Sequence, residues 1–117
     1  MIFFMPRAAT TADVFNAIAE ARRRDILVLL APDERPVGEI AAALKLPQPS
    51  VSKHLMVLRS VGLVEERREG RHILYRTNAE ALRPLHDWAQ IFAPFWRHQL
   101  LRVKARAEAK YKGGHTP

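Results

Sequence analysis

The fold is decided by residues 37–63, which run VGEIAAALKLPQPSVSKHLMVLRSVGL. The first part places apolar residues at the i, i+3, i+4 and i+7 positions of a helix over about 37–45. The stretch 46–49 contains two prolines and breaks the chain, and a second helix follows it, with Gly62 just beyond its end. Two helices joined by so short a turn predict a helix–turn–helix over residues 37–61.

The second of these helices has a polar outer face. If Val51, Leu55 and Leu58 point inward, a rotation of 100° per residue points five other side chains outward. These five are Ser52, Lys53, Met56, Arg59 and Ser60. Hydroxyl and basic side chains suit phosphates and guanine, and an amide such as that of Gln48 suits adenine. A helix of this length fits the major groove of DNA, and its first turn offers N–H groups to a phosphate.

Six residues of this helix are therefore candidates for DNA contact. They are Gln48, Ser50, Ser52, Lys53, His54 and Arg59. We expect Gln48, Ser50 and Ser52, at the helix start, to recognise bases or phosphates. We expect Lys53 and Arg59 to neutralise phosphates. His54 lies at the edge of the apolar stripe, where packing within the fold and contact with a phosphate both stay open.

A change to strand periodicity follows this helix. Residues 63–68 and 72–76 predict two short strands, and residues 69–71 between them have hairpin spacing, with a glycine suited to positive φ. The hairpin, residues 63–76, predicts a wing whose basic tip reaches a neighbouring groove or its phosphates. The wing candidates for DNA contact are Arg67, Arg68, Arg71 and His72. This basic character is diluted by Glu65, Glu66 and Glu69.

Helices are also predicted on the N-terminal side. Either Thr10 or Thr11 is suited to cap a first helix, and a second helix covers about residues 22–31. A polar loop with two prolines, residues 31–36, separates them from the helix–turn–helix. The expected fold class is mainly α (α+β): a winged helix–turn–helix of about five helices and a two-stranded hairpin, in one domain over residues 1–117.

The C-terminal segment, residues 79–112, is again helical in pattern. Pro84 marks a helix start, and Pro94 is expected to kink or divide the long helix. An amphipathic helix that extends past a small core is most simply covered by a second copy of the chain, although an aromatic stripe can also line a ligand pocket. The predicted dimer interface comprises Trp88, Phe92, Phe95, Trp96 and Leu100.

Composition limits the function further. The chain has 117 residues, no cysteine, and 19 basic against 12 acidic residues, for a formal net charge of +7. The absence of cysteine excludes disulfides, a thiol nucleophile and thiolate metal sites, and the positive charge favours double-stranded DNA as the partner. Residues 1–5 form an apolar stretch too short for a signal peptide, and no apolar run approaches a membrane span. We expect a cytoplasmic protein with no membrane partner.

No sequence feature indicates an enzyme or a cofactor. The chain lacks a glycine-rich phosphate loop, an HExxH motif and a carboxylate pair at a pocket-forming position. A metal site on the last helix would need His86, Asp87 and His98. Asp87 and His98 lie on nearly the same helix face but roughly 16 Å apart along it, so no metal site is predicted.

Within the helix–turn–helix, the sequence resembles ArsR-type winged-helix repressors. The resemblance rests on LPQPSVSKHL at 46–55, VLR at 57–59 and GLV at 62–64, and it extends less specifically over residues 13–76. It implies a dimeric bacterial or archaeal transcription repressor whose terminal helices form the dimer interface.

Two positions depart from the pattern of that family. Pro47 stands where the family usually has Ser or Asn, so the recognition helix lacks a side-chain cap at this position. Glu20-Ala21-Arg22 stands where the family often has Asp-Pro-Thr, so three arginines begin a helix, where positive charge opposes the helix dipole. A phosphate partner and a solvated turn are both open for these arginines.

The sequence thus predicts a sequence-specific regulator, a homodimeric repressor that binds an inverted-repeat operator. Two alternatives stay open. One is a metal- or small-ligand-sensing regulator that uses the C-terminal helix, and the other is a winged-helix protein-interaction module with only non-specific DNA affinity. The sequence does not identify an effector.

Overall fold

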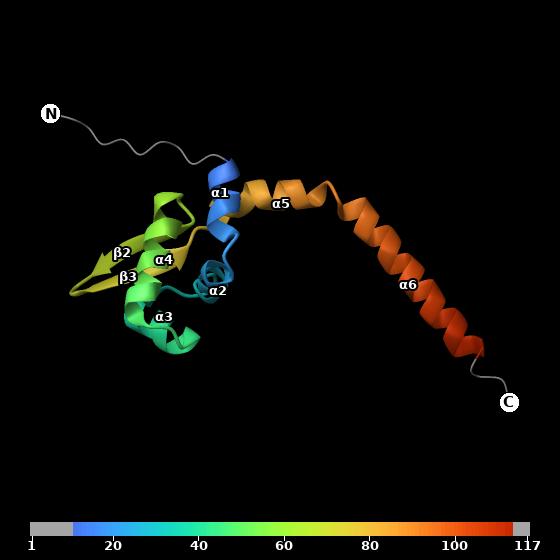
Figure 1. Ribbon diagram of the computed structural model, residues 1–117, viewed down its shortest axis with the longest axis horizontal. Coiled ribbons are helices and arrows are strands. Elements are labelled where there is room, and N and C mark those ends of the chain that lie inside the picture. The colour runs from blue at the N-terminus through green and yellow to red at the C-terminus, as the bar shows by residue number, and fades with distance from the viewer. Residues whose placement is uncertain (1–10, 114–117) are drawn as a thin grey trace. The chain divides into compact units, whose positions relative to one another are not determined.

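Figure 1 shows the computed structural model of the chain, which describes residues 11–113. Two compact units are present, one ending at Leu85 and the other beginning at His86. Unit 1 contains α1 (Thr11–Ile18), α2 (Ala21–Leu29), β1 (Arg35–Pro36), α3 (Val37–Leu44), α4 (Gln48–Ser60), β2 (Val64–Glu69), β3 (His72–Thr77) and the 3₁₀ turn η1 (Ala79–Leu82). Helix α5 (Arg83–Gln90) spans the boundary, and α6 (Ala93–Gly113) lies in unit 2. The predicted cap at Thr10 and the apolar start at residues 1–5 lie outside the described residues.

The core of unit 1 is formed by apolar side chains from α1 to α4 and from the start of β2. The stripe predicted for α4 is buried, with Val51 and Leu58 at 0% exposure and Leu55 at 3%. Gly62 follows α4 with a φ of 79°, and the N–H of Leu63 donates to the carbonyl of Leu58 at 2.9 Å. This arrangement closes the helix and turns the chain into β2. The predicted helix–turn–helix and its inward stripe are therefore confirmed.

The sheet has three antiparallel strands in the order β1-β3-β2, whereas the sequence predicted two. The added strand β1 is only two residues long and pairs Arg35 with Tyr75 and Pro36 with Leu74. A two-residue strand has no periodicity to detect, and proline is tolerated because β1 lies at the sheet edge. The predicted polar loop therefore ends in a strand that braces the hairpin.

The β2–β3 hairpin ends in a two-residue turn at Gly70 and Arg71, because Glu69 pairs with His72. Gly70 has a φ of 60°, and no other residue of the turn has positive φ. Positive φ at the first turn position alone is typical of a type II′ turn. Figure 1 shows this hairpin extending away from the helices of unit 1.

Strand β3 is fastened to α2 by a buried polar residue. The Oγ1 hydroxyl of Thr77 donates to the carbonyl of Leu27 at 2.7 Å, and its N–H donates to the carbonyl of Leu30 at 3.2 Å. Thr77 is 9% exposed, so these bonds replace water for its polar groups. They fix the base of the hairpin relative to the helices that hold α4.

Two prolines fall inside helices instead of in the predicted breaks. Pro49 is the second residue of α4, so α4 begins two residues earlier than the proline-rich stretch suggested, and Pro94 is the second residue of α6. A first-turn N–H has no partner within its own helix, so proline costs little there. The C-terminal segment is divided as predicted, by a break at Ile91 and Phe92, and the described residues contain six α-helices instead of about five.

Candidate nucleic-acid interface

The turn between α3 and α4 is three residues long and is held by backbone hydrogen bonds. Lys45 adopts a left-handed conformation with a φ of 55°, and the N–H of Leu46 donates to the carbonyl of Ala41 at 3.0 Å. The carbonyl of Pro47 accepts a hydrogen bond from the N–H of Ser50 at 3.0 Å. No side chain caps the start of α4, so the positive end of its dipole is not neutralised by a capping group. The hydrogen bonds of the turn fix the direction of α4 relative to α3.

The outer face of α4 is accessible along its length. All five side chains that were predicted to point outward are exposed, namely Ser52, Lys53, Met56, Arg59 and Ser60. At the helix start, Gln48 is exposed and Ser50 is half-buried. The predicted orientation of α4 is thus confirmed, while contact of these residues with DNA stays a prediction.

His54 lies against the junction of α1 and α2. Its Nε2 atom is 3.6 Å from Oε1 of Glu20, and its side chain is 17% exposed. The other oxygen of Glu20 is 3.0 Å from Nη1 of Arg23. Glu20 therefore connects α2 with the recognition helix, and the structure has His54 in the packing position that the sequence left open.

The arginines at the start of α2 have a partner that the sequence analysis missed. Arg23 Nε donates to the carbonyl of Ala17 at 2.5 Å, and Arg24 Nη1 donates to the carbonyl of Ile18 at 2.8 Å. Both carbonyls lie in the last turn of α1, where positive charge is favourable and carbonyls lack partners within the helix. These arginines therefore cap α1, and their unusual position in the sequence was the signal for this role.

The tip of the hairpin and the middle of α4 carry basic side chains that are exposed and have no ion pair within residues 11–113. We call them the open cations, and they are Lys53, Arg68 and Arg71. His72, also predicted to contact DNA, is exposed as well. An unpaired guanidinium or ammonium group can bind a phosphate without first breaking an ion pair with a carboxylate.

The end of α4 and the two strands of the hairpin carry basic side chains that are already bonded to glutamates. We call them the paired cations, and they are Arg59, Arg67 and Arg76. Arg59 lies 3.0 Å from Glu66, and Arg76 lies 3.0 Å from Glu65. Two of the predicted DNA contacts, Arg59 and Arg67, thus belong to this group, which the sequence could not separate from the open cations.

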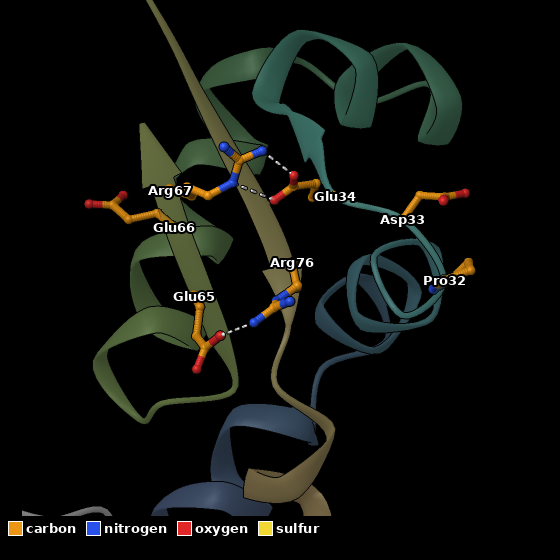
Figure 2. Close-up of a pocket in the computed structure, with 7 residues that line it drawn as sticks. All are labelled: Pro32, Asp33, Glu34, Glu65, Glu66, Arg67 and Arg76. Atoms are coloured by element: carbon orange, nitrogen blue, oxygen red, sulfur yellow. Dashed lines mark hydrogen bonds and ion pairs between the residues drawn. The ribbon is translucent and has the colours of Figure 1, made fainter. Parts of the chain in front are cut away.

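Arg67 has the most extensive of these interactions. It donates to both carboxylate oxygens of Glu34 and, at 2.8 Å, to Glu69. The hydrogen bond from Arg67 lowers the pKa of Glu34, and the same contact raises the pKa of Arg67. Figure 2 shows Arg67 bonded to Glu34, and Arg76 bonded to Glu65. These four side chains line an open hollow of about 650 Å³. Because its charged walls are largely bonded to one another, the hollow does not resemble an apolar ligand site.

A half-buried tyrosine, Tyr75, lies near the contact between α4 and the hairpin. Burial, and then the charge of Glu66, raise the pKa of Tyr75, while Arg59 acts in the opposite direction. Arg59 and Glu66 therefore form a polar link between the end of α4 and β2, which holds the wing close to the recognition helix.

Unit 2 exposes large apolar side chains. The residues predicted to form the dimer interface have exposed fractions of 50% for Trp88, 38% for Phe92, 65% for Phe95, 54% for Trp96 and 69% for Leu100. Trp88 and Phe92 make an edge-to-face ring contact at 5.2 Å. No residue of unit 2 whose side chain is described is buried. Exposed apolar surface of this kind marks an interaction site in soluble proteins.

The other candidate groups of unit 2 form only small clusters. Nδ1 of His86 lies 3.3 Å from Oδ1 of Asp87, and Nε2 of His86 lies 3.1 Å from the Gln90 amide. Within the part of the chain that the structure describes, no group of three or more His, Asp or Glu side chains could hold a metal ion. No described helix is long and apolar enough to cross a membrane.

Two helices joined by a three-residue turn, with an accessible second helix and a basic β-hairpin after it, define a winged helix–turn–helix DNA-binding domain. A comparison of sequences identifies the family. Residues 20–66 match the family described as bacterial regulatory protein, arsR family. The chain is 34% identical over 103 residues to the arsenic resistance transcriptional regulator ArsR2 of Pseudomonas putida, covering 87% of this chain and 79% of that protein. The protein belongs to the ArsR family of transcriptional regulators.

Two further relatives agree with this assignment. The transcriptional repressor SdpR of Bacillus subtilis is 34% identical over 76 residues, which are 65% of this chain and 84% of SdpR. The homodimeric winged helix–turn–helix domain of a possible ArsR-family regulator from Mycobacterium bovis superposes with a TM-score of 0.59 at 42% identity, covering 71% of this chain and 77% of that one. The expected family and fold class are confirmed, and so is the expectation of a regulator instead of an enzyme.

Proposed function

We propose that the protein is a homodimeric transcriptional repressor that places α4 in the major groove at each half of an inverted-repeat operator. The observation that carries the proposal is the outer face of α4, which is exposed from Gln48 to Ser60 and contains no acidic side chain. In this proposal Gln48, Ser50 and Ser52 read bases or phosphates at the helix start, and the open cations neutralise phosphates on either side.

Dimerisation is supported by the apolar surface of unit 2. Phe95 and Trp96 are 65% and 54% exposed, and a second copy of the chain would bury them. The Mycobacterium bovis relative is homodimeric, and the relative from Bacillus subtilis is a repressor. Repression would be steric, because a dimer that occupies two half-sites about one helical turn apart covers promoter DNA.

The first experiment measures binding of the full chain to DNA from upstream of its own gene, at two salt concentrations and against random competitor DNA. We expect competitor-resistant binding at an inverted repeat, with affinity that falls steeply as salt rises. Gln48→Ala is expected to relax base preference at one position of each half-site. Weak binding that competitor abolishes would contradict the proposal and favour a module with only non-specific DNA affinity.

A second experiment tests the role of the dimer. Trp96→Glu places a charge in the apolar surface of unit 2, so we expect a monomer in sedimentation analysis and loss of tight operator binding. Val28→Glu is the matched control, because Val28 is 74% exposed on α2 and lies outside the proposed interface. If Trp96→Glu stays dimeric, this surface is not the interface.

A further inference from the structure

The most exposed large apolar side chain of α4 is not among the DNA-contact residues named so far. Met56 is 71% exposed, and it lies between the polar side chains of Ser52, Lys53 and Ser60 on the same face. The buried stripe of α4 lies on the opposite side, so Met56 does not contribute to the core. Met56 therefore has no packing role within the domain, and its side chain is accessible to a partner that binds this face.

Helix geometry places Met56 within the surface that would enter the groove. It is separated from Lys53 by three residues and from Ser52 by four, which are the spacings of neighbours on one helix face. With a rise of 1.5 Å per residue, Met56 lies about 6 Å beyond Ser52 along α4. That distance corresponds to about two base-pair steps of 3.4 Å. The nearby cation Arg59 is bonded to Glu66, so the surface around Met56 is less charged than the start of the helix.

The major groove offers one apolar feature to such a side chain. Thymine presents its C5-methyl group there, whereas the other bases present only hydrogen-bond donors and acceptors. Methionine is flexible and polarizable, so it can adapt to a methyl group on the groove floor. We propose that Met56 is a specificity-determining residue that contacts a thymine C5-methyl group, about two base steps from the bases read by the start of α4. This inference rests on the proposed function, because it requires α4 to lie in the major groove.

The test removes the methyl group without changing base pairing. The operator is first obtained by selection of random DNA with the full-length wild-type chain, and each thymine is then replaced singly by deoxyuridine. Wild-type protein is expected to lose affinity about fourfold at one thymine of each half-site, and roughly fifteenfold when both half-sites lack the methyl group. Met56→Ala removes the contact from both half-sites, so it is expected to bind the unmodified operator roughly fifteenfold more weakly than the wild type. Replacing that thymine by deoxyuridine should not weaken the binding of Met56→Ala further.

Two variants serve as controls. Lys53→Ala is expected to weaken binding to all sequences while keeping the deoxyuridine penalty, because it removes a phosphate contact and leaves Met56 in place. Val28→Ala truncates another exposed apolar side chain, on α2, and is expected to change neither affinity nor the penalty. Because Met56 is exposed and alanine favours helix, melting temperatures should show that Met56→Ala folds normally.

The outcomes separate the inference from the function on which it rests. If wild-type protein selects a defined site but Met56→Ala keeps the same deoxyuridine profile, the role of Met56 is overturned and the repressor proposal stands. If deoxyuridine weakens wild-type binding at no thymine, the role of Met56 is likewise overturned and the repressor proposal stands. If the wild-type chain selects no defined site, both proposals fail.

Discussion

The open cations and the paired cations lie on the same domain but differ in what they can do. The open cations are exposed on α4 and at the hairpin tip, without an ion pair in residues 11–113. The paired cations lie 2.8–3.0 Å from glutamates of β2. A phosphate must compete with a carboxylate for a paired cation, and the carboxylate itself repels the phosphate. The positive charge of the sequence is therefore an upper limit on the charge available for DNA.

The largest expected effect comes from an open cation. Lys53→Ala removes one phosphate contact from each half-site, so we expect operator affinity to fall by about tenfold to a hundredfold at low salt. The slope of log affinity against log salt should become shallower by about two for a dimer. Binding titrations over a salt series measure both quantities. Lys110→Ala removes the same charge from exposed α6, and an equal loss in that control would show that only net charge matters.

The difference between Lys53 and Arg67 also shows the limit of prediction from sequence. Helix periodicity was sufficient to orient α4, because the rotation from one residue to the next places Val51 on the inner side of the helix and Lys53 on the outer side. The pairing of Arg67 with Glu34 joins residues 33 positions apart and depends on β1, whose two residues have no detectable period. Sequence patterns thus located the exposed face of α4 and the basic hairpin but could not show which cations were already paired with carboxylates.

The same limit applies to the arginines that begin α2. Three successive cations at a helix start conflict with the dipole of that helix, and the sequence offered only a phosphate or solvent as a partner. The tertiary contact resolves the conflict, because Arg23 and Arg24 reach the C-terminal carbonyls of α1. Positive charge at the start of α2 is tolerated because the contacts with α1 compensate for the unfavourable dipole interaction.

The next largest effect should appear in stability and not in DNA binding. Arg23 is 16% exposed in its side chain and bonds both Ala17 and Glu20. Arg23→Ala is expected to lower the free energy of unfolding by about 1–2 kcal/mol. Thermal unfolding should show this as a fall in melting temperature of roughly 4–8 °C. The salt dependence of operator binding should not change.

The neighbouring arginine supplies the control for this variant. Arg22 is 57% exposed and lies 3.6 Å from Asp25, so its ion pair is a weak surface contact. Arg22→Ala should therefore leave the melting temperature almost unchanged. Equal destabilisation by the two substitutions would argue against the capping role of Arg23.

A smaller effect separates the two groups within the hairpin itself. Arg71→Ala removes an open cation, and we expect operator affinity to fall by about threefold to tenfold. Arg67→Ala removes a cation that is already occupied by Glu34 and Glu69 and makes no free contact with a phosphate, so the expected loss is smaller, about twofold. Parallel titrations at one salt concentration compare the two variants directly. Equal losses would mean that Arg67 exchanges its carboxylates for phosphates when DNA binds.

The smallest effect has the opposite sign and tests the pairing itself. Glu34→Gln removes one of the two carboxylates that hold Arg67, so we expect operator binding to become about twofold tighter and its salt dependence steeper. The lowered pKa of Glu34 means that its ion pair stabilises the fold above the ordinary carboxyl value of 4.5 and that this contribution is lost as the pH falls through the lowered pKa. The wild type should therefore melt slightly above Glu34→Gln at pH 7, and the two should converge in acid. Glu80→Gln is the control, because Glu80 pairs with Arg83 away from the hairpin. Unchanged binding by Glu34→Gln would mean that releasing Arg67 from Glu34 does not let it reach DNA.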